Sequence, residues 1–432
     1  MNEPKHGTPQ RFLFAMWEGG GNVPPQLELA RRLVQRGHHV RVMSDQCNEP
    51  EAKAAGCDFV AYTHAPSRRD KSAASTIVRD YEAKTPLQGF VIFRDTMVNS
   101  ARAYAEDVLA ELEREPADVV AVSDFLFGPM IAAEKARIPY AILSPNSYMN
   151  FAPFAPPRNA LERVRDRMLN WVALRTLNGG LPTLNAARAA LGLAPLAHIL
   201  EPMQRADRML VLTSPAFDFK VDALPDNVRY VGPMLDDPSW AANAPARDAN
   251  PVGSHRLVVV SFSTTFQNQG AILQRVLDAV GELPVRVIAT LGPTLDAGQF
   301  RVPCNVELQR LARHSELFKR AAAVVTHAGH GTVIRALAGG VPLVCIPMGR
   351  DQNGNAARVV ARNAGKMLPL KASVAAIRAA INEVVTVPYY REQAQVLAAS
   401  IVRDAQSSRA VDEIEGIALR AGQEVADVAT PV

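Results

Sequence analysis

The fold is decided by residues 324–355, which read VVTHAGHGTVIRALAGGVPLVCIPMGRDQNGN. This stretch opens on a short apolar run ending at Thr326, turns on glycines, continues in a helical pattern and closes on a second apolar run, Leu343 to Ile346. An apolar run, a glycine turn, a helix and a further apolar run are typical of two parallel strands joined by a crossover helix. The stretch therefore predicts an α/β fold with a parallel sheet.

The same alternation continues on both sides. Strands are expected at Phe12–Met16, His39–Met43, Asp58–Tyr62, Asp118–Val122, Tyr140–Leu143, Arg208–Thr213 and Val228–Val231, and then at Leu257–Phe262, Val285–Thr290, Val306–Leu308, Ala323–Thr326 and Leu343–Ile346. Helices at Val374–Val384, Glu392–Arg403 and Arg409–Arg420 are expected to close the chain without new strands.

Residues 234–254 are rich in Pro, Asp, Ala, Asn and Gly and lack periodicity, which predicts a linker. We expect two Rossmann-like, doubly wound domains, residues 1–233 and 255–405, that face each other across a cleft. A C-terminal helix and tail, residues 406–432, are expected to pack back on the first domain.

The composition excludes several classes of protein. Of 432 residues, 48% are apolar and 21% are charged, as in ordinary globular proteins. The net charge of +4 is spread along the chain, which argues against a nucleic-acid partner. The four cysteines have neither zinc nor redox spacing, and the apolar run Phe12 to Trp17 is too short for a signal peptide or membrane span. We therefore expect a cytoplasmic enzyme without membrane insertion, a monomer or homodimer.

The glycine turn of the opening stretch has the properties of a diphosphate site. A helix N-terminus attracts anions, and Gly329 and Gly331 would let a phosphate approach the backbone amides. His327 and Thr332 could add hydrogen-bond donors. An ordinary strand-to-helix turn, with glycines that only permit packing, is the alternative.

The next strand is followed by Asp351 and Gln352, whose carboxylate and amide could hydrogen-bond the vicinal hydroxyls of a sugar. A helix cap made by Asp351 or Asn353 is the alternative. The two turns together indicate a sugar linked to a diphosphate.

The motifs between Val325 and Asn355 resemble the donor signature of the UDP-glycosyltransferase superfamily, whose members have the GT-B fold. The resemblance implies that His327 and Thr332 contact the diphosphate and that Asp351 and Gln352 hold the sugar. It also implies that Thr264 approaches the phosphate or sugar, and that His314 lies near the base. The first domain would then bind the acceptor and the second the nucleotide sugar, with no further cofactor and no metal.

Two positions depart from the family pattern. Arg335 stands where many members place a glutamate on the ribose, and Leu311 to His314 replace the Trp-x-Pro-Gln stretch of the plant branch. The first departure leaves the ribose and base specificity open. The second favours the bacterial natural-product branch and leaves UDP and dTDP open as carriers.

The catalytic half departs further. The family places a histidine base three residues before a proline in the first turn, and Asn22 stands where that base should be. An amide cannot act as a general base. Asp124 matches the family's partner aspartate and could be the base, its pKa raised by apolar neighbours, or it could cap a helix. Glu18 could supply the carboxylate or be an exposed loop charge. An acidic acceptor positioned by Asn22 is the third alternative.

An aromatic, proline-rich stretch after the strand at Tyr140 to Leu143 is the candidate acceptor wall, with Asn146, Tyr148 and Phe151 as binding residues. It could equally be a dimer contact. His64 begins another loop that could line the acceptor cleft.

The hypothesis is thus an inverting, metal-independent transfer of a hexose from a nucleoside diphosphate to a hydroxyl, or an amine or carbon, of a hydrophobic small molecule. A silent nucleotide-sugar-binding auxiliary protein and a sugar-nucleotide epimerase of similar fold are the alternatives.

Overall fold

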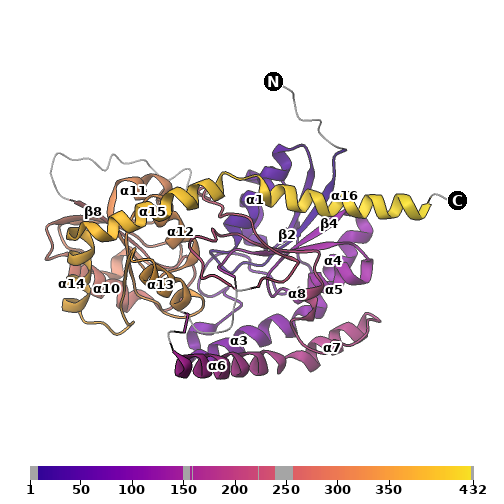
Figure 1. The fold of residues 1–432 in the computed structure, drawn as a ribbon, viewed down its shortest axis with the longest axis horizontal. Helices are drawn as coiled ribbons and strands as arrows, with labels where there is room; N and C mark the ends of the chain where they lie inside the picture. Colours follow the sequence, from indigo (N-terminus) through magenta and orange to yellow (C-terminus); the bar gives the residue numbers. More distant parts are fainter. Residues whose placement is uncertain (1–7, 149–155, 158, 222, 239–255, 430–432) are drawn as a thin grey trace.

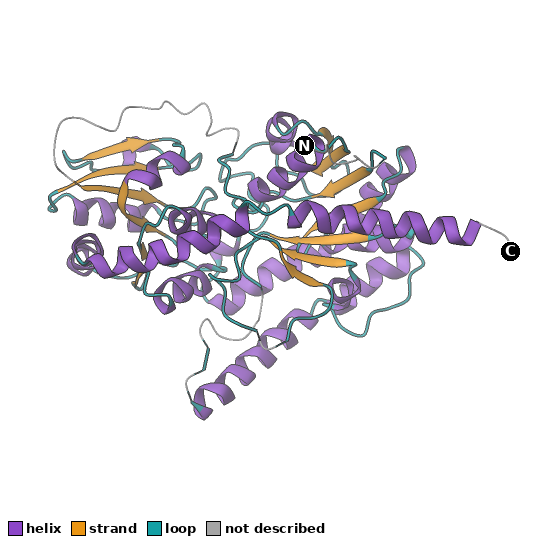
Figure 2. Ribbon diagram, turned by 45° about the horizontal axis from the view of Figure 1, so that its top comes forward, coloured by secondary structure: helices purple, strands orange, loops and turns teal. Residues whose placement is uncertain are grey.

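The computed structural model describes residues 8–148, 156–157, 159–221, 223–238 and 256–429. It forms two lobes side by side, each a parallel sheet enclosed by helices (Figures 1 and 2). The α/β prediction, with two doubly wound parallel sheets, is confirmed.

The N-terminal lobe holds a seven-stranded sheet in the order β3-β2-β1-β4-β5-β6-β7. Its strands are β1 (Arg11–Ala15), β2 (His39–Ser44), β3 (Asp58–Ala61), β4 (Val119–Ser123), β5 (Tyr140–Ser144), β6 (Arg208–Val211) and β7 (Val228–Tyr230). Its helices are α1 (Val23–Gln35), α2 (Glu49–Ala54), α3 (Pro86–Asn99), α4 (Ala101–Arg114), α5 (Phe127–Ala136), α6 (Ala160–Asn178), α7 (Leu181–Ala190) and α8 (Glu201–Arg205), with short 3₁₀ helices η1 (Gln46–Asn48) and η2 (Asp80–Glu82).

The C-terminal lobe holds a six-stranded sheet in the order β10-β9-β8-β11-β12-β13. Its strands are β8 (Arg256–Ser261), β9 (Val285–Thr290), β10 (Val306–Gln309), β11 (Ala321–Thr326), β12 (Leu343–Cys345) and β13 (Gly365–Met367). Its helices are α10 (Gly270–Val280), η3 (Ala297–Gln299), α11 (His314–Arg320), α12 (His330–Ala338), α13 (Gln352–Ala361), α14 (Val374–Thr386) and α15 (Pro388–Ala405). One strand was not predicted, β13, which extends the sheet beside β12. Among the described residues after it, only helices follow, as predicted.

Alternating residues explain why both faces of each sheet are covered. In β1, Leu13 and Ala15 enter one core while Phe12 and Phe14 enter another. Strands with two buried faces need apolar residues at every position, which is why they read as continuous apolar runs.

The last helix, α16 (Arg409–Ala429), runs from the C-terminal lobe back along the N-terminal lobe (Figure 1). Its apolar face, which includes Val411, Ile414 and Ile417, is buried with Phe12 and Phe14 of β1. Glu415 also pairs with His38 at 2.8 Å. Within the described part of the chain, no helix has the length and apolar character to cross a membrane. All four cysteines are free thiols.

Candidate active site

A cavity of about 2480 Å³ opens between the two lobes. The strand order of each sheet reverses once, between β1 and β4 and between β8 and β11, and the loops after these four strands line the cavity. Crevices at such reversals are the ordinary ligand sites of parallel sheets. The structure brings thirteen of the predicted site residues to this cavity: Glu18, Asn22, Asp124, Asn146, Tyr148, Thr264, His314, His327, Gly329, Gly331, Thr332, Asp351 and Gln352. Phe151 lies outside the described residues.

The glycine turn opens into the cavity as a diphosphate site would. Gly329 precedes α12 as its N-cap residue, and the first N–H groups of a helix lack partners within it. A side chain at Gly329 would begin 2.5 Å from Nε2 of His327, so glycine is needed for the imidazole to lie across the turn. Gly331 and Thr332 line the same opening.

His327 is held as a neutral ring. It is 7% exposed and stacks on Phe262 with ring centres 6.3 Å apart. Burial, assisted by the Arg350 guanidinium, lowers the pKa of His327 to about 4. At neutral pH the imidazole can therefore offer a diphosphate a hydrogen bond but no full charge.

His314 and Thr264 lie on the β8 side of the cavity. His314 stacks on Phe318 with ring centres 4.9 Å apart, and burial lowers the pKa of His314 to about 4. A neutral ring at the cavity wall is compatible with contact to a nucleoside base. Thr264 is exposed in the loop after β8.

Asp351 and Gln352, in the turn after β12, differ in their hydrogen bonds. Oδ2 of Asp351 accepts from Asn355 at 2.6 Å, and Asp351 makes no side-chain cap of α13, so the capping alternative is wrong for this residue. Gln352 is 1% exposed, accepts from the N–H groups of Met348 and Gly349, and donates to Gln267 at 2.8 Å. The carboxylate of Asp351 therefore lines the cavity and can accept further hydrogen bonds, whereas the side chain of Gln352 holds the turn in its shape.

Asp124 is a buried carboxylate at the end of β4. It is 9% exposed, and Oδ2 accepts from Ser144 at 3.0 Å. Burial raises the pKa of Asp124 to about 7, against the lowering effect of the Ser144 hydrogen bond, and the charge of Asp351 raises it further. The helix-cap alternative is wrong, because α5 begins after Leu126 and has no side-chain cap. Asp124 thus combines a cavity position with a pKa suited to accepting a proton.

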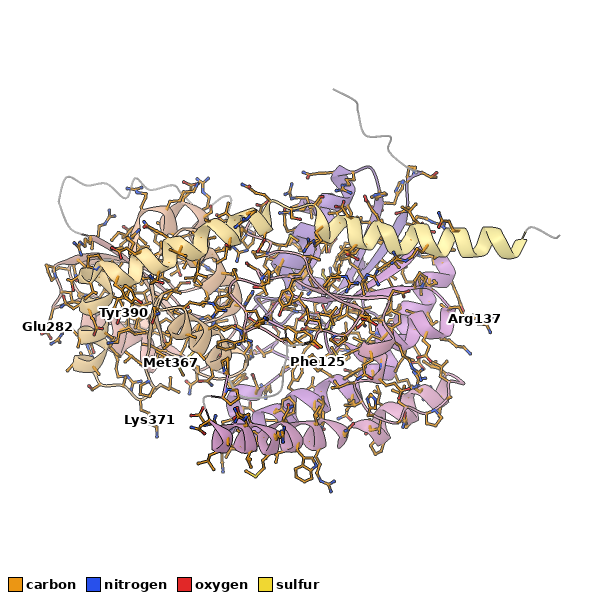
Figure 3. The ribbon with its side chains drawn as sticks, viewed as in Figure 1. Phe125, Arg137, Glu282, Met367, Lys371 and Tyr390 are labelled. Atoms are coloured by element: carbon orange, nitrogen blue, oxygen red, sulfur yellow. The ribbon has the colours of Figure 1, made fainter. Side chains whose placement is uncertain are left out.

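Strained backbone marks four of the loops at this end of the sheets. Phe125, Asn268, Ala328 and Arg350 have φ values of 60°, 55°, 68° and 54°. Residues other than glycine seldom adopt this left-handed backbone conformation. Those that do are concentrated at functional sites, where the surrounding structure holds them in it. Figure 3 shows Phe125 between the two lobes.

Asn22 is occupied by its own turn. Its Oδ1 accepts from Gly19 at 3.0 Å, and its Nδ2 donates to the carbonyl of Trp17 at 3.0 Å. The side chain therefore closes the turn after β1. This arrangement argues against the hypothesis that Asn22 positions the acceptor.

Glu18 is buried, so its interpretation as an exposed loop charge was wrong. It is 5% exposed, and its Oε1 accepts from Gly20 at 2.6 Å. Burial raises the pKa of Glu18, opposed by the charges of Lys71 and Arg68. Gly20 needs to be glycine, since it has a φ of 91° and a side chain there would begin 2.6 Å from Thr265 of the other lobe. Glu18 thus holds a turn that meets the donor lobe.

Only part of the predicted acceptor wall lies within the described residues. The backbone N–H of Tyr148 donates to Asp218 at 2.8 Å, and Asn146 and Tyr148 line the cavity. His64 does not line it. Its ring is 69% exposed and pairs with Asp107 at 2.6 Å.

An aromatic wall of the cavity was not predicted from the sequence. Trp17, Phe93 and Phe125 line the cavity, with ring centres 6.2 Å apart for the first pair and 5.8 Å for the second. Trp17 in the first turn was the available signal, whereas α3, which carries Phe93, was not predicted.

Arg335, the departure at the ribose position, is engaged with the chain that leaves the N-terminal lobe. It donates to the carbonyls of Leu235 and Asp236 at 3.2 and 2.9 Å. In this arrangement the arginine ties α12 to that segment.

Comparisons with known proteins agree with the fold and with the resemblance that the donor motif indicates. Residues 274–417 match the family described as erythromycin biosynthesis protein CIII-like, C-terminal domain. The chain is 29% identical over 430 residues to 4'-demethylrebeccamycin synthase of Lentzea aerocolonigenes, covering 94% of this chain and 99% of that one. It is 24% identical over 416 residues to oleandomycin glycosyltransferase of Streptomyces antibioticus, covering 94% and 91%.

Among solved structures, the glycotransferase of kitacinnamycin superposes with a TM-score of 0.74 at 22% identity, covering 95% of this chain and 99% of that one. The resemblance inferred from the donor motif is confirmed. The chain has the GT-B fold of these structures. It is similar in sequence to bacterial natural-product glycosyltransferases and is a nucleotide-sugar-dependent glycosyltransferase.

Proposed function

We propose that the protein transfers a hexose from a uridine or thymidine diphosphate to a hydroxyl of a hydrophobic small molecule, with inversion and without a metal ion. An amine or carbon is the alternative acceptor atom. The observation that carries the proposal is Asp124, a buried carboxylate with a pKa of about 7 that lines the same cavity as the donor turns.

In the proposed reaction, Asp124 takes the proton of the acceptor hydroxyl while the oxygen attacks the anomeric carbon. The bond between that carbon and the diphosphate oxygen breaks, and the electron pair leaves with the diphosphate. A single displacement of this kind inverts the anomeric centre. Asn22 cannot take the proton, because its amide is bonded to the turn and is not basic at useful pH.

The leaving diphosphate is stabilised by the N-terminus of α12, His327 and Thr332. Oriented N–H groups in a site shielded from water stabilise developing negative charge without reorganisation. Asp351 accepts hydrogen bonds from the sugar hydroxyls, and Gln352 acts as a positioning residue for that turn. His314 lies beside the base.

The acceptor class is supported by the aromatic wall and by the relatives. Trp17, Phe93 and Phe125 offer apolar aromatic surface at the cavity, with their rings inclined to one another. The two relatives are named for rebeccamycin and oleandomycin, which supports a small-molecule acceptor.

The test is mass spectrometry of the purified protein with UDP- and dTDP-hexoses and a mixed library of phenols and macrolide-like alcohols, with and without EDTA. The expected result is a hexosylated acceptor in both conditions, with an inverted anomeric configuration by NMR. An epimerised donor formed without acceptor, or donor binding without any turnover, would contradict the proposal.

A further inference from the structure

The cavity wall formed by α6 carries two oxygen atoms that are buried and without hydrogen-bond partners among the described residues, Oδ2 of Asp166 and Oδ1 of Asn170. Both residues line the cavity. They are four residues apart in α6, so they lie one above the other on the same helix face. Neither oxygen belongs to the donor or base positions described above.

Burying such oxygens without a partner costs free energy, so a partner beyond the described residues is expected, and a ligand bound in the cavity would supply one. Asp166 is 5% exposed, and its other oxygen already accepts from Nε of Arg165 at 2.9 Å. The Arg165 guanidinium also balances the carboxylate charge. The two free oxygens therefore suit a neutral N–H or O–H group better than a cation.

Aromatic side chains connect the proposed base, Asp124, with the helix that packs against α6. Phe125 follows Asp124 directly, Phe93 of α3 packs on Phe125 and Trp17 packs on Phe93. Helix α3 in turn packs against α6, and the two run beside each other in Figure 1. The rings are inclined to one another by 50° and 71°, so an aromatic acceptor would pack against their faces and edges, with one end at Asp124 and the other toward α6.

We propose that Asp166 and Asn170 form a specificity subsite that accepts a hydrogen bond from an N–H or O–H group on the distal edge of a planar, polycyclic aromatic acceptor. This inference rests on the proposed function, since it assigns the acceptor class of that reaction. The group at the distal edge is bound and oriented, while the glycosylated group lies at Asp124.

The test compares two ligands of the same outline, a hydroxylated phenanthridinone, which has a lactam N–H, and the corresponding benzocoumarin lactone, which has a ring oxygen there. Their dissociation constants are measured by fluorescence in the absence of donor. Wild type is expected to bind the lactam roughly 10-fold or more tightly than the lactone, because the lactone leaves the two oxygens unpaired. Asn170→Leu is expected to weaken lactam binding and bring the ratio toward one.

Asp166→Asn, which keeps the side-chain size, provides a second variant that is expected to reduce the same ratio. Met168→Leu, on the exposed face of α6, is the matched control and should leave the ratio at its wild-type value. Equal affinities in wild type, no binding of either ligand, or an unchanged ratio in Asn170→Leu would overturn the subsite. Because binding is measured without donor, a failure of glycosyl transfer alone would count against the proposed function and leave the subsite standing.

Discussion

Asp80 and Arg350 join the two lobes at the cavity. Nε and a terminal nitrogen of Arg350 lie 2.6 and 2.7 Å from the two carboxylate oxygens of Asp80, in a paired, charge-assisted geometry. Beside them, Tyr81 packs edge-on against Phe266 of the other lobe at 5.1 Å. The segment Asp80–Glu82 therefore fastens the N-terminal lobe to the loops that surround the donor.

Arg350→Gln is expected to loosen this contact and lower kcat/KM for the nucleotide sugar by about 10-fold, equivalent to about 1.4 kcal/mol. The Arg350 guanidinium is partly shielded from solvent, so its removal should cost more free energy than the loss of an exposed surface ion pair. Steady-state kinetics check the result. Arg301→Gln, which removes a pair with Asp278 within one lobe, is the control, and an equal loss in both variants would count against a role in joining the lobes.

His327→Ala is expected to weaken binding of the bare nucleoside diphosphate by about 1–3 kcal/mol, the cost of one lost hydrogen bond to a charged group. Isothermal titration calorimetry measures the affinity. His64→Ala, an exposed histidine away from the cavity, should bind as wild type does. Unchanged affinity in His327→Ala would remove this residue from the donor site.

Asp351→Asn and Gln352→Ala are expected to act in different ways. Asp351→Asn should weaken binding of the sugar nucleotide more than binding of the bare nucleotide, because only the sugar loses a hydrogen-bond acceptor. Gln352→Ala should also lower the melting temperature, since the N–H groups of Met348 and Gly349 lose their acceptor. Calorimetry with both ligands and thermal unfolding separate these effects, and equal losses for the two ligands in Asp351→Asn would contradict the sugar assignment.

The pKa of Asp124 predicts a pH dependence of both activity and stability. The ionised form is the base, so kcat/KM with a neutral alcohol should rise with pH and level off above about 7. The native state holds this proton above the pH at which the unfolded chain releases it, so ionisation costs stability as pH rises from the ordinary aspartate range to about 7. Relative to wild type, Asp124→Asn should therefore gain stability across that interval and stay level above it. Urea unfolding at several pH values measures the difference, and a pH-independent difference would show that Asp124 is not the titrating group.

The sequence predicted the sheets well and the catalytic half poorly, for a physical reason. Buried parallel strands leave continuous apolar runs, and the donor motif lies within one βαβ unit, so both are local patterns. The strand Gly365–Met367 was missed because three residues carry little pattern. The contact of Asp80 with Arg350 joins residues 270 positions apart, and the burial of Glu18 depends on Asp45, Arg68 and Lys71. No local pattern encodes such relationships.

The same limit applies to Asn22. Its position matched the family's base, and the residue type excluded that role, but only the structure shows that its amide closes the turn through Gly19 and Trp17. Asn22→His would lose these two hydrogen bonds, so a gain of activity toward alcohols requires the new imidazole to reach Asp124 while the turn remains closed.

The most direct test of Asp124 as the base is the ratio of wild-type to Asp124→Asn turnover across acceptors of graded pKa, measured at saturating donor. With an alcohol, the variant should be slower by about 100-fold or more, the scale of a lost general base, while donor affinity hardly changes. With increasingly acidic phenols the ratio should fall toward one, because the acceptor is already ionised. A small ratio that is the same for every acceptor would contradict the assignment and shift it to Glu18 or to positioning of the acceptor alone.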